Sequence, residues 1–312
     1  MKWYLPLILA LLVLSGCSGT GVEDRQGSTE NPAETRNPVE NADEPRPQAE
    51  ARNPAENTEE PRNPVEQTEE PRNPVEVQIP ADTPKMQEVE PVGDPVRVKE
   101  LAWDSQSTDC TLWLPEDGQY VPFLALSGDY GGSVLLLRRD ILPESRPFNS
   151  YSAYYEDSAL DRWLREEYVS RLEAVRDRLR SAEIVITAEG GLGVSGEETT
   201  TITREAFLLS CAETGFESLS SGGAEGRALA YFQTAENRIA RGADGVPTSW
   251  WLRTPDSFYL SAAYGIGPDG SLGSGNAFND NGVRPALCLD ADAEAVPVRG
   301  IVDGEAVYAL VP

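Results

Sequence analysis

The sequence contains no histidine, and this absence removes the commonest tools of protein catalysis. Serine or cysteine nucleophiles activated by a neighbouring histidine, zinc held by imidazole, and histidine acid–base chemistry are all excluded. Asp and Glu are abundant, but no pair of them is distinguished by its spacing. We therefore expect a protein that is not an enzyme and that needs no cofactor.

Basic residues and cysteines are also scarce. The chain has 26 Lys and Arg against 52 Asp and Glu, a net charge of −26, which argues against a nucleic-acid partner because such a partner requires a basic surface. The four cysteines, Cys17, Cys110, Cys211 and Cys288, form no Cys-x-x-Cys metal motif. The last three allow one disulfide and one spare thiol, or three buried thiols, and the sequence leaves both open.

The N-terminus has the pattern of an export signal. A positive charge at Lys2 precedes an apolar run over 5–14 that is too short to span a bilayer. The run ends in Leu14-Ser-Gly-Cys17, which resembles the bacterial lipobox. That resemblance implies removal of residues 1–16, attachment of two acyl chains at Cys17, and a chain anchored to the outer face of a bacterial membrane.

Residues 18–95 lack aromatic side chains and have few aliphatic ones. They are rich in Pro, Glu, Asn and Arg, and 19 acidic against 7 basic residues give a net charge of −12. Glu59–Glu66 recurs as Glu69–Glu76 with a period too short for a solenoid. Such a segment buries too little apolar surface to fold, so we expect a disordered, extended spacer, with a proline-motif ligand for a partner as the alternative.

Residues 96–312 carry the patterns of an α+β domain with an irregular antiparallel sheet and long loops. A capping box at Ser158–Asp161 opens an amphipathic helix to Leu179, and a second box at Ser210–Glu213 opens a short helix. Residues 225–240 are weakly helical. Strands are expected at 133–137, 184–188, 206–209 and 286–289, with two or three in 96–126 and a hairpin around Asp303-Gly304.

The stretch from Ser249 to Leu289 is the most informative part of this domain. Trp250 and Trp251 end a buried strand, and Pro268-Asp-Gly270 turns a hairpin whose second arm is rich in Gly, Ser and Asn. The glycines at 265, 267 and 270 match a dinucleotide-binding pattern by chance, because they stand in a turn rather than before a helix.

Several motifs in a fixed order resemble an uncharacterised bacterial domain found in surface proteins and lipoproteins. The motifs are Ser133–Leu137, Ser158–Leu164, Phe207–Ser210 with Glu213, Trp251–Pro255 and Gly282–Leu287. Their ending is similar to that of formylglycine-generating (sulfatase-modifying factor) proteins and phage-type variable receptors. This resemblance implies a C-type-lectin-like fold. It assigns structural roles to Trp251, Arg253, Gly282, Arg284 and Pro285.

In lectin-like folds the late loops carry the ligand surface, so the resemblance places ligand-binding residues within 256–281. Aromatic and amide side chains there suit a sugar or a protein surface. The residues concerned are Tyr259, Tyr264, Asn276, Phe278, Asn279, Asp280 and Asn281. Asn279–Gly282 also fits a simple turn. No metal site is assigned, although calcium held by Asn and Asp oxygens is a further possibility.

Three functional hypotheses follow. The first is a lipid-anchored surface module that binds a glycan, a wall polymer or a protein without catalysis. The second is a structural envelope lipoprotein that packs against a protein partner. The third is an enzyme that uses carboxylates, for example on glycans.

Overall fold

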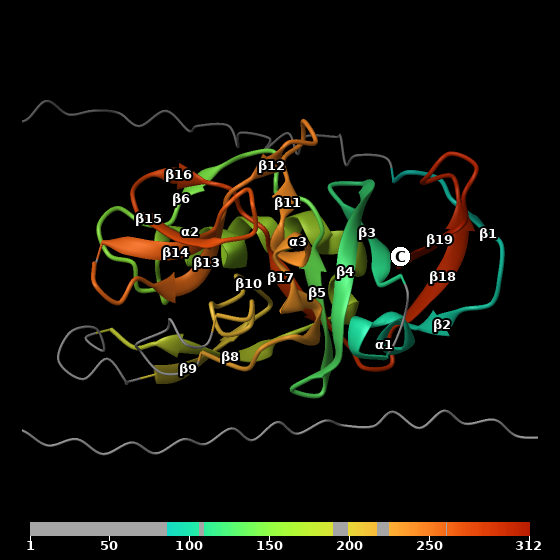
Figure 1. Cartoon of the computed structure of the whole chain (residues 1–312). Helices are drawn as coiled ribbons and strands as arrows, with labels where there is room; N and C mark the ends of the chain where they lie inside the picture. The colour runs from blue at the N-terminus through green and yellow to red at the C-terminus, as the bar shows by residue number, and fades with distance from the viewer. Residues whose placement is uncertain (1–85, 106–108, 190–198, 217–224, 260) are drawn as a thin grey trace, which may run out of the picture. The chain divides into compact units, whose positions relative to one another are not determined.

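The structure is a computed structural model that describes residues 86–105, 109–189, 199–216, 225–259 and 261–312 (Figure 1). The chain divides into two units, 1–74 and 75–312, and every described residue belongs to the second. The predicted signal peptide, the lipobox cysteine Cys17 and most of the 18–95 spacer lie outside the described residues. Within the described part, no helix has the length and apolar character needed to cross a membrane.

A long, mostly antiparallel sheet that curls into a half-barrel forms the centre of the domain. Its order is β1-β18-β19-β3-β4-β5-β17-β10, with β2 added to β18 and β7 added to β17, and only β19 and β3 run parallel. The strands are β1 (Glu90–Pro91), β2 (Val96–Arg97), β3 (Thr111–Glu116), β4 (Gln119–Tyr130), β5 (Ser133–Arg138), β7 (Leu179–Arg180), β10 (Ala206–Phe207), β17 (Ala286–Leu289), β18 (Glu294–Arg299) and β19 (Val307–Ala309).

The other strands form four smaller sheets. The three-stranded sheet β13-β14-β15 lies at the end of the molecule away from β18 and β19 (Figure 1). Its strands are β13 (Trp250–Pro255), β14 (Ala262–Ile266) and β15 (Leu272–Asn276). The strand pairs are β8 (Ala182–Thr187) with β9 (Thr199–Arg204), β11 (Ala240–Arg241) with β12 (Pro247–Thr248), and β6 (Arg146–Pro147) with β16 (Asp280–Asn281).

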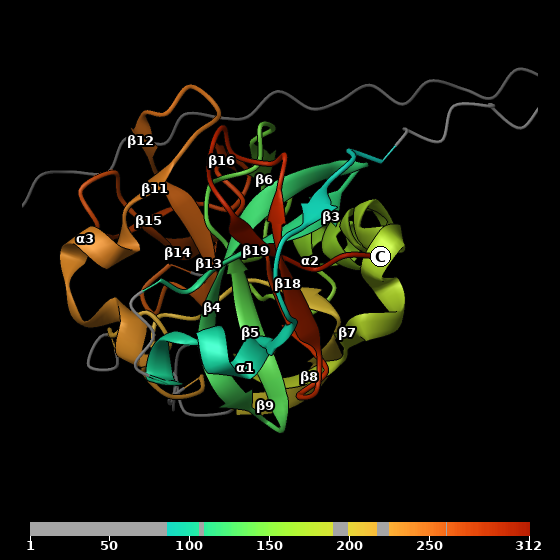
Figure 2. The same ribbon diagram turned by 90° about the vertical axis from the view of Figure 1, so that its right-hand side faces the viewer.

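The helices are short and irregular. One helical segment comprises α2 (Ala159–Trp163), a π-helical turn (Leu164–Tyr168) and a 3₁₀ stretch (Val169–Arg178), and it packs against β3 and β10. Figure 2 shows this segment in yellow-green and α3 in orange on opposite sides of the view. The other helical pieces are α1 (Val98–Leu101), α3 (Ala235–Arg238) and 3₁₀ turns at Trp103–Ser105 and Ala230–Gln233.

The expected α+β class is wrong, because the protein is mostly β, with 40% strand and 17% helix. Two of the expected helices account for much of the error. Ser210–Glu213 is a turn, and 225–240 holds only the single turns Ala230–Gln233 and α3. The expected C-type-lectin-like arrangement is not found either. The late strand β17 joins the long sheet between β5 and β10 and pairs with neither β14 nor β15.

Other expectations are confirmed at the level of single elements. Ser158 caps α2, since its hydroxyl accepts a hydrogen bond from the Asp161 amide at 3.0 Å. Pro268–Gly270 turns the β14-β15 hairpin, and β18 and β19 form the antiparallel pair around Asp303-Gly304. The strand β1 lies inside the segment assigned to the spacer and pairs with β18, so the domain includes residues before 96.

The core is built from the inward faces of the long sheet, the helical segment and β13. Cys110, Cys211 and Cys288 are free and buried within it, so the three-thiol alternative is the one the structure adopts. Burial raises the pKa of the Cys110 thiol to about 11 and that of Cys288 to about 12. All three cysteines therefore act as small apolar side chains rather than reactive groups.

Gly282 joins the three-stranded sheet to the segment that leads into β17. The Trp251 amide donates to the Gly282 carbonyl at 2.9 Å, and the Gly282 amide donates to the Ser249 carbonyl at 3.2 Å. A Cβ atom at this position would lie 2.4 Å from the Ser249 oxygen and 2.8 Å from the Ile141 side chain. Only glycine permits this close approach of two backbones.

Gly282→Ala is expected to destabilise the domain by about 1–3 kcal/mol, because the added methyl group forces the two backbones apart. Gly273→Ala is the matched control, since a Cβ there has no atom within 4 Å. Urea unfolding of both variants measures the difference. Equal unfolding midpoints for Gly282→Ala and Gly273→Ala would contradict the packing role of Gly282.

Candidate functional site

A buried ion pair between Arg253 and Glu213 connects two of the motifs found in the sequence. The guanidinium of Arg253, on β13, donates to both carboxylate oxygens of Glu213, at 2.6 and 3.1 Å, and both side chains are fully buried. Glu213 also forms the predicted reciprocal box with Ser210. The Ser210 amide donates to the carboxylate at 2.9 Å, and the Glu213 amide donates to the Ser210 hydroxyl at 3.1 Å.

This pair extends into a larger polar network. The Tyr130 hydroxyl donates to Glu213 at 2.6 Å, and the second buried carboxylate, Glu225, accepts hydrogen bonds from Thr187 and Thr254. Burial opposes the charge of Arg253, but Glu213, together with Tyr130 and Glu225, raises the pKa of Arg253 above its ordinary value. Burial and the same carboxylate raise the pKa of Tyr130, so its hydroxyl stays protonated and remains a donor.

The residues assigned structural roles by resemblance are all buried: Trp251, Arg253, Gly282, Arg284 and Pro285. Arg284 donates from Nε to the Arg138 carbonyl at 2.8 Å, and its guanidinium lies 5.0 Å from the centre of the Trp250 ring. No carboxylate bonds to it among the described residues, and burial lowers the pKa of Arg284 to about 10. These contacts place the motif residues in the scaffold rather than on the surface.

The predicted ligand-binding residues divide into three groups. Asn279, Asp280 and Asn281 line one pocket of about 250 Å³, whose floor includes Trp251 and four glycines of the β14-β15 hairpin: Gly265, Gly267, Gly273 and Gly275. The Asn281 side chain is partly committed to the fold, since its oxygen accepts from the Ser249 hydroxyl at 2.6 Å. The structure therefore brings three of the seven residues together in one pocket.

Tyr259 and Phe278 form the second group and are exposed at the adjoining end of this sheet, whereas Tyr264 and Asn276 lie apart on β14 and β15. Alternation along β14 places Tyr264 on the face opposite Gly265, where its hydroxyl lies 3.4 Å from that of Ser257. Asn276 is exposed at the end of β15. Neither Tyr264 nor Asn276 lines the glycine-floored pocket.

Backbone hydrogen bonds tie three loops together at this end of the sheet. The Ala277 amide donates to the Ser261 carbonyl at 2.7 Å, and the Asn149 amide donates to the Ala277 carbonyl at 2.9 Å. These loops carry four of the six large apolar side chains that are exposed in the described residues, with exposed fractions from 57% to 85%. The four are Tyr151, Phe258, Tyr259 and Phe278, which we call the aromatic end.

Sequence reasoning missed Tyr151 because its loop lies more than a hundred residues before the others. The pairing of β6 with β16 and the hydrogen bond from Asn149 to Ala277 bring it to the aromatic end. No local pattern around Tyr151 indicates that contact. The one available signal in the sequence was an aromatic residue between two serines, Ser150 and Ser152.

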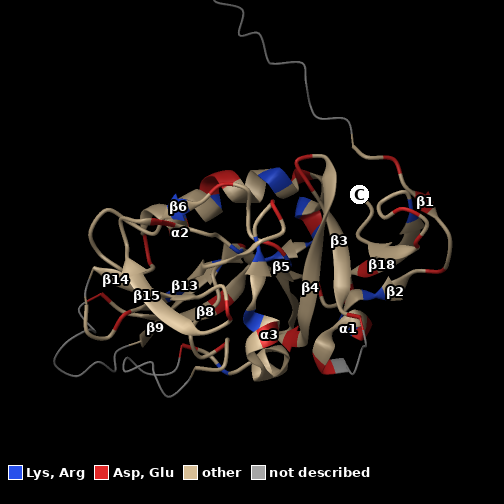
Figure 3. Ribbon diagram, turned by 45° about the horizontal axis from the view of Figure 1, so that its top comes forward, with Lys and Arg blue, Asp and Glu red and all other residues tan. Residues whose placement is uncertain are grey.

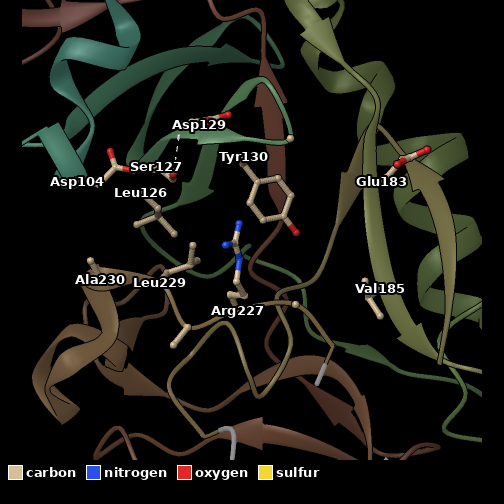
Figure 4. A pocket seen from close by; sticks show the side chains of 13 residues that line it. Asp104, Leu126, Ser127, Asp129, Tyr130, Glu183, Val185, Arg227, Leu229 and Ala230 are labelled. Atoms are coloured by element: carbon tan, nitrogen blue, oxygen red, sulfur yellow. Dashed lines mark hydrogen bonds between the residues drawn. The ribbon is translucent and has the colours of Figure 1, made fainter. Parts of the chain in front are cut away.

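A second cavity of about 460 Å³ lies among β4, β8 and the segment 226–230, and Figure 4 shows its side chains. Its polar groups come from Asp104, Ser127, Asp129, Glu183 and Arg227, with the Tyr130 ring between them. None of these residues belongs to the predicted ligand-binding set. Their positions in the sequence span more than 120 residues, so no motif could have joined them.

Calcium at this end of the sheet stays a prediction. Within the described part of the chain, no three Asp, Glu, Cys or His side chains are grouped so that they could hold a metal ion. Asp280 stands on β16, which pairs with β6, and lines the glycine-floored pocket. Any calcium there would take its remaining oxygens from amide, carbonyl or ligand groups.

A model of one protein family matches residues 131–291, a range that runs from the β4-β5 turn through β17. The family is described as Domain of unknown function (DUF6273). The chain belongs to this family. The match confirms the sequence-based assignment to an uncharacterised domain family, and its limits enclose the Glu213–Arg253 pair and both late motifs. Neither the curated proteins nor the solved structures contain a match to the chain.

Glu213→Gln is expected to cost about 3–5 kcal/mol of stability, because it leaves the Arg253 charge buried without a partner. Glu205→Gln is the matched control. Glu205 pairs with Arg176 at 3.1 Å on the surface, where such a pair contributes about 0–1 kcal/mol. Thermal and urea unfolding test both variants, and equal losses would show that the buried pair is not essential to the fold.

Proposed function

We propose that the chain is a lipid-anchored binding module on the outer face of a bacterial membrane, without catalytic activity, and that its ligand is a glycan or a glycan-containing wall polymer. The observation that carries this proposal is the aromatic end. Four exposed aromatic side chains on three neighbouring loops stand beside the glycine-floored pocket. Exposed apolar groups gathered in this way are typical of interaction surfaces.

The chemistry of these loops favours a sugar. Aromatic rings offer flat apolar faces for the C–H faces of a pyranose, and the Asn279 amide and nearby Ser hydroxyls offer partners for sugar hydroxyls. Among the glycines of the pocket floor, Gly273 has no steric reason to lack a side chain, since a Cβ there would meet open space. The absence of a side chain at Gly273 leaves room above the sheet.

The charge of the aromatic end decides between two classes of ligand, a glycan and a lipid surface. Strands β14 and β15 have no charged residue and appear in tan in Figure 3. The described residues of the loops 149–151, 256–261 and 277–281 contain two aspartates, Asp256 and Asp280, and no Lys or Arg. Binding to an anionic membrane surface depends on basic residues, so this end of an acidic protein suits an uncharged polymer.

Binding of the full chain, purified with detergent present, to neutral oligosaccharides and wall fragments tests this proposal. Replacement of Tyr259 or Phe278 by Ser is expected to weaken binding by about 2- to 10-fold for each ring, the range of a single aromatic contact. Gly273→Val fills the pocket and is expected to abolish binding there without loss of stability. Val246→Ser, which changes an exposed apolar residue on another loop, is the control.

Repeating the titration with calcium and with a chelator shows whether Asn279 and Asp280 act through a metal ion. Unchanged affinity in the Tyr259, Phe278 and Gly273 variants would show that the ligand does not bind at the aromatic end. Capture of one protein partner that survives these changes, with no glycan bound, would instead favour the role of a structural envelope lipoprotein.

Anchoring depends on Cys17, whose side chain is the acyl acceptor in the proposed lipoprotein. Cys17→Ser is expected to abolish incorporation of labelled palmitate and to leave the chain unprocessed, because a hydroxyl does not replace the sulfur of a lipobox. Cys110→Ser keeps the lipobox and serves as the control. Labelling that persists in Cys17→Ser cells would exclude the lipid anchor.

A further inference from the structure

The cavity of about 460 Å³ lies apart from the glycine-floored pocket, and the two share no residue. Its walls come from the end of the β4-β5 hairpin, from β8 and from the segment 226–230. The volume lies within the range of about 300–1,000 Å³ that is usual for small-molecule sites. The cavity is large enough for a ligand of the size of a dipeptide.

Arg227 supplies the distinctive group of this cavity. Figure 4 shows its side chain reaching toward Tyr130, with Leu126, Leu229 and Ala230 beside it. Within the described residues it has neither a hydrogen bond nor an ion pair, although carboxylates line the same cavity. Arg227 is exposed to solvent at the wall of the cavity. An exposed guanidinium with free donors can bind a carboxylate or phosphate through two parallel hydrogen bonds.

The other charged side chains of the cavity are acidic, and two of them are held in place by hydrogen bonds. Both oxygens of Asp104 accept from the Gly128 amide, at 2.9 and 3.2 Å, and the Asp129 carboxylate accepts from the Gly132 amide at 3.0 Å. Glu183 lines the opposite wall. These charges repel a phosphate or any polyanion, but they attract an ammonium group carried by the same ligand.

The floor of the cavity is rigid because it stands on the buried ion pair. The Tyr130 hydroxyl is bonded to Glu213, and Gly226 adopts φ +100° directly against Glu213, where a Cβ would lie 3.1 Å from the carboxylate. Leu126, Val185 and Leu229 give the rest of the lining an apolar character. A preformed lining of this kind reduces the entropy that binding would cost.

We propose that this cavity binds a free amino acid or short peptide, with the ligand carboxylate on Arg227 and its amino group beside Asp104 and Asp129. The apolar wall then contacts the ligand side chain. This inference does not depend on the glycan-binding proposal, because the two sites use different residues.

Calorimetric titration of the full chain, purified with detergent present, with the dipeptide alanyl-leucine tests the proposal. Arg227→Gln is expected to weaken binding at least tenfold, and Arg227→Lys less than Arg227→Gln, because lysine keeps the charge but loses the paired donors. Arg299→Gln is the control, since Arg299 is an exposed arginine on β18 outside the cavity. The C-terminal amide and the N-acetyl form of the dipeptide are each expected to bind at least tenfold more weakly than the free form.

Three outcomes would overturn the proposal. Equal affinity for the amide and the free dipeptide would show that the ligand carboxylate does not bind Arg227. Equal affinity for the N-acetyl form and the free dipeptide would show that the ligand amino group does not bind at the acidic wall. No measurable heat with alanyl-leucine at millimolar concentration would exclude this class of ligand. Gly273→Val is expected to leave dipeptide binding unchanged, so failure of the glycan proposal and failure of this one are distinguishable.

Discussion

The structure depends on one desolvated ion pair, Arg253 with Glu213. Two charges that have lost contact with water are tolerated only where their remaining donors and acceptors are also satisfied. Glu213 meets this condition through the Ser210 amide and the Tyr130 hydroxyl, and Arg253 meets it through the carbonyl oxygens of Val185, Leu208 and Glu225. The pair therefore fixes β4, β8, the turn after β10 and β13 against one another. Loss of either charge would leave the other without a partner at the junction of four segments.

Both cavities follow from how β13 and its neighbours are held. Trp251 and Arg253 are two residues apart on β13, and both are buried. Trp251 forms part of the floor of the glycine-floored pocket, while Arg253 holds Glu213 beneath the cavity that contains Arg227. A rigid scaffold with variable loops at its ends is the usual arrangement in binding proteins. Here one buried strand lies beneath two separate cavities.

Single elements were predictable from the sequence, but their arrangement was not. The Ser158 cap, the Ser210–Glu213 box and the Pro268–Gly270 turn follow from local chemistry, and each is present. The fold class failed because short helical patterns such as 225–240 resolve into single turns, and because the partner of β17 is chosen by packing rather than by sequence order. Only part of the candidate sites could be predicted from the sequence. Asn279–Asn281 lie on one loop, whereas Tyr151 and Arg227 acquire their neighbours through contacts across the chain.

The groups of the described residues that are able to contact a ligand lie at the surface rather than in the core. In the core, Glu213 and Glu225 are each held by several donors and have no contact with solvent, so neither carboxylate is presented to a ligand. The three described cysteines are buried thiols, and histidine is absent. Among the described residues, four aromatic rings are exposed at one sheet end, and the Arg227 guanidinium has no hydrogen bond or ion pair. Groups of this kind bind and orient molecules, which supports the proposed binding role.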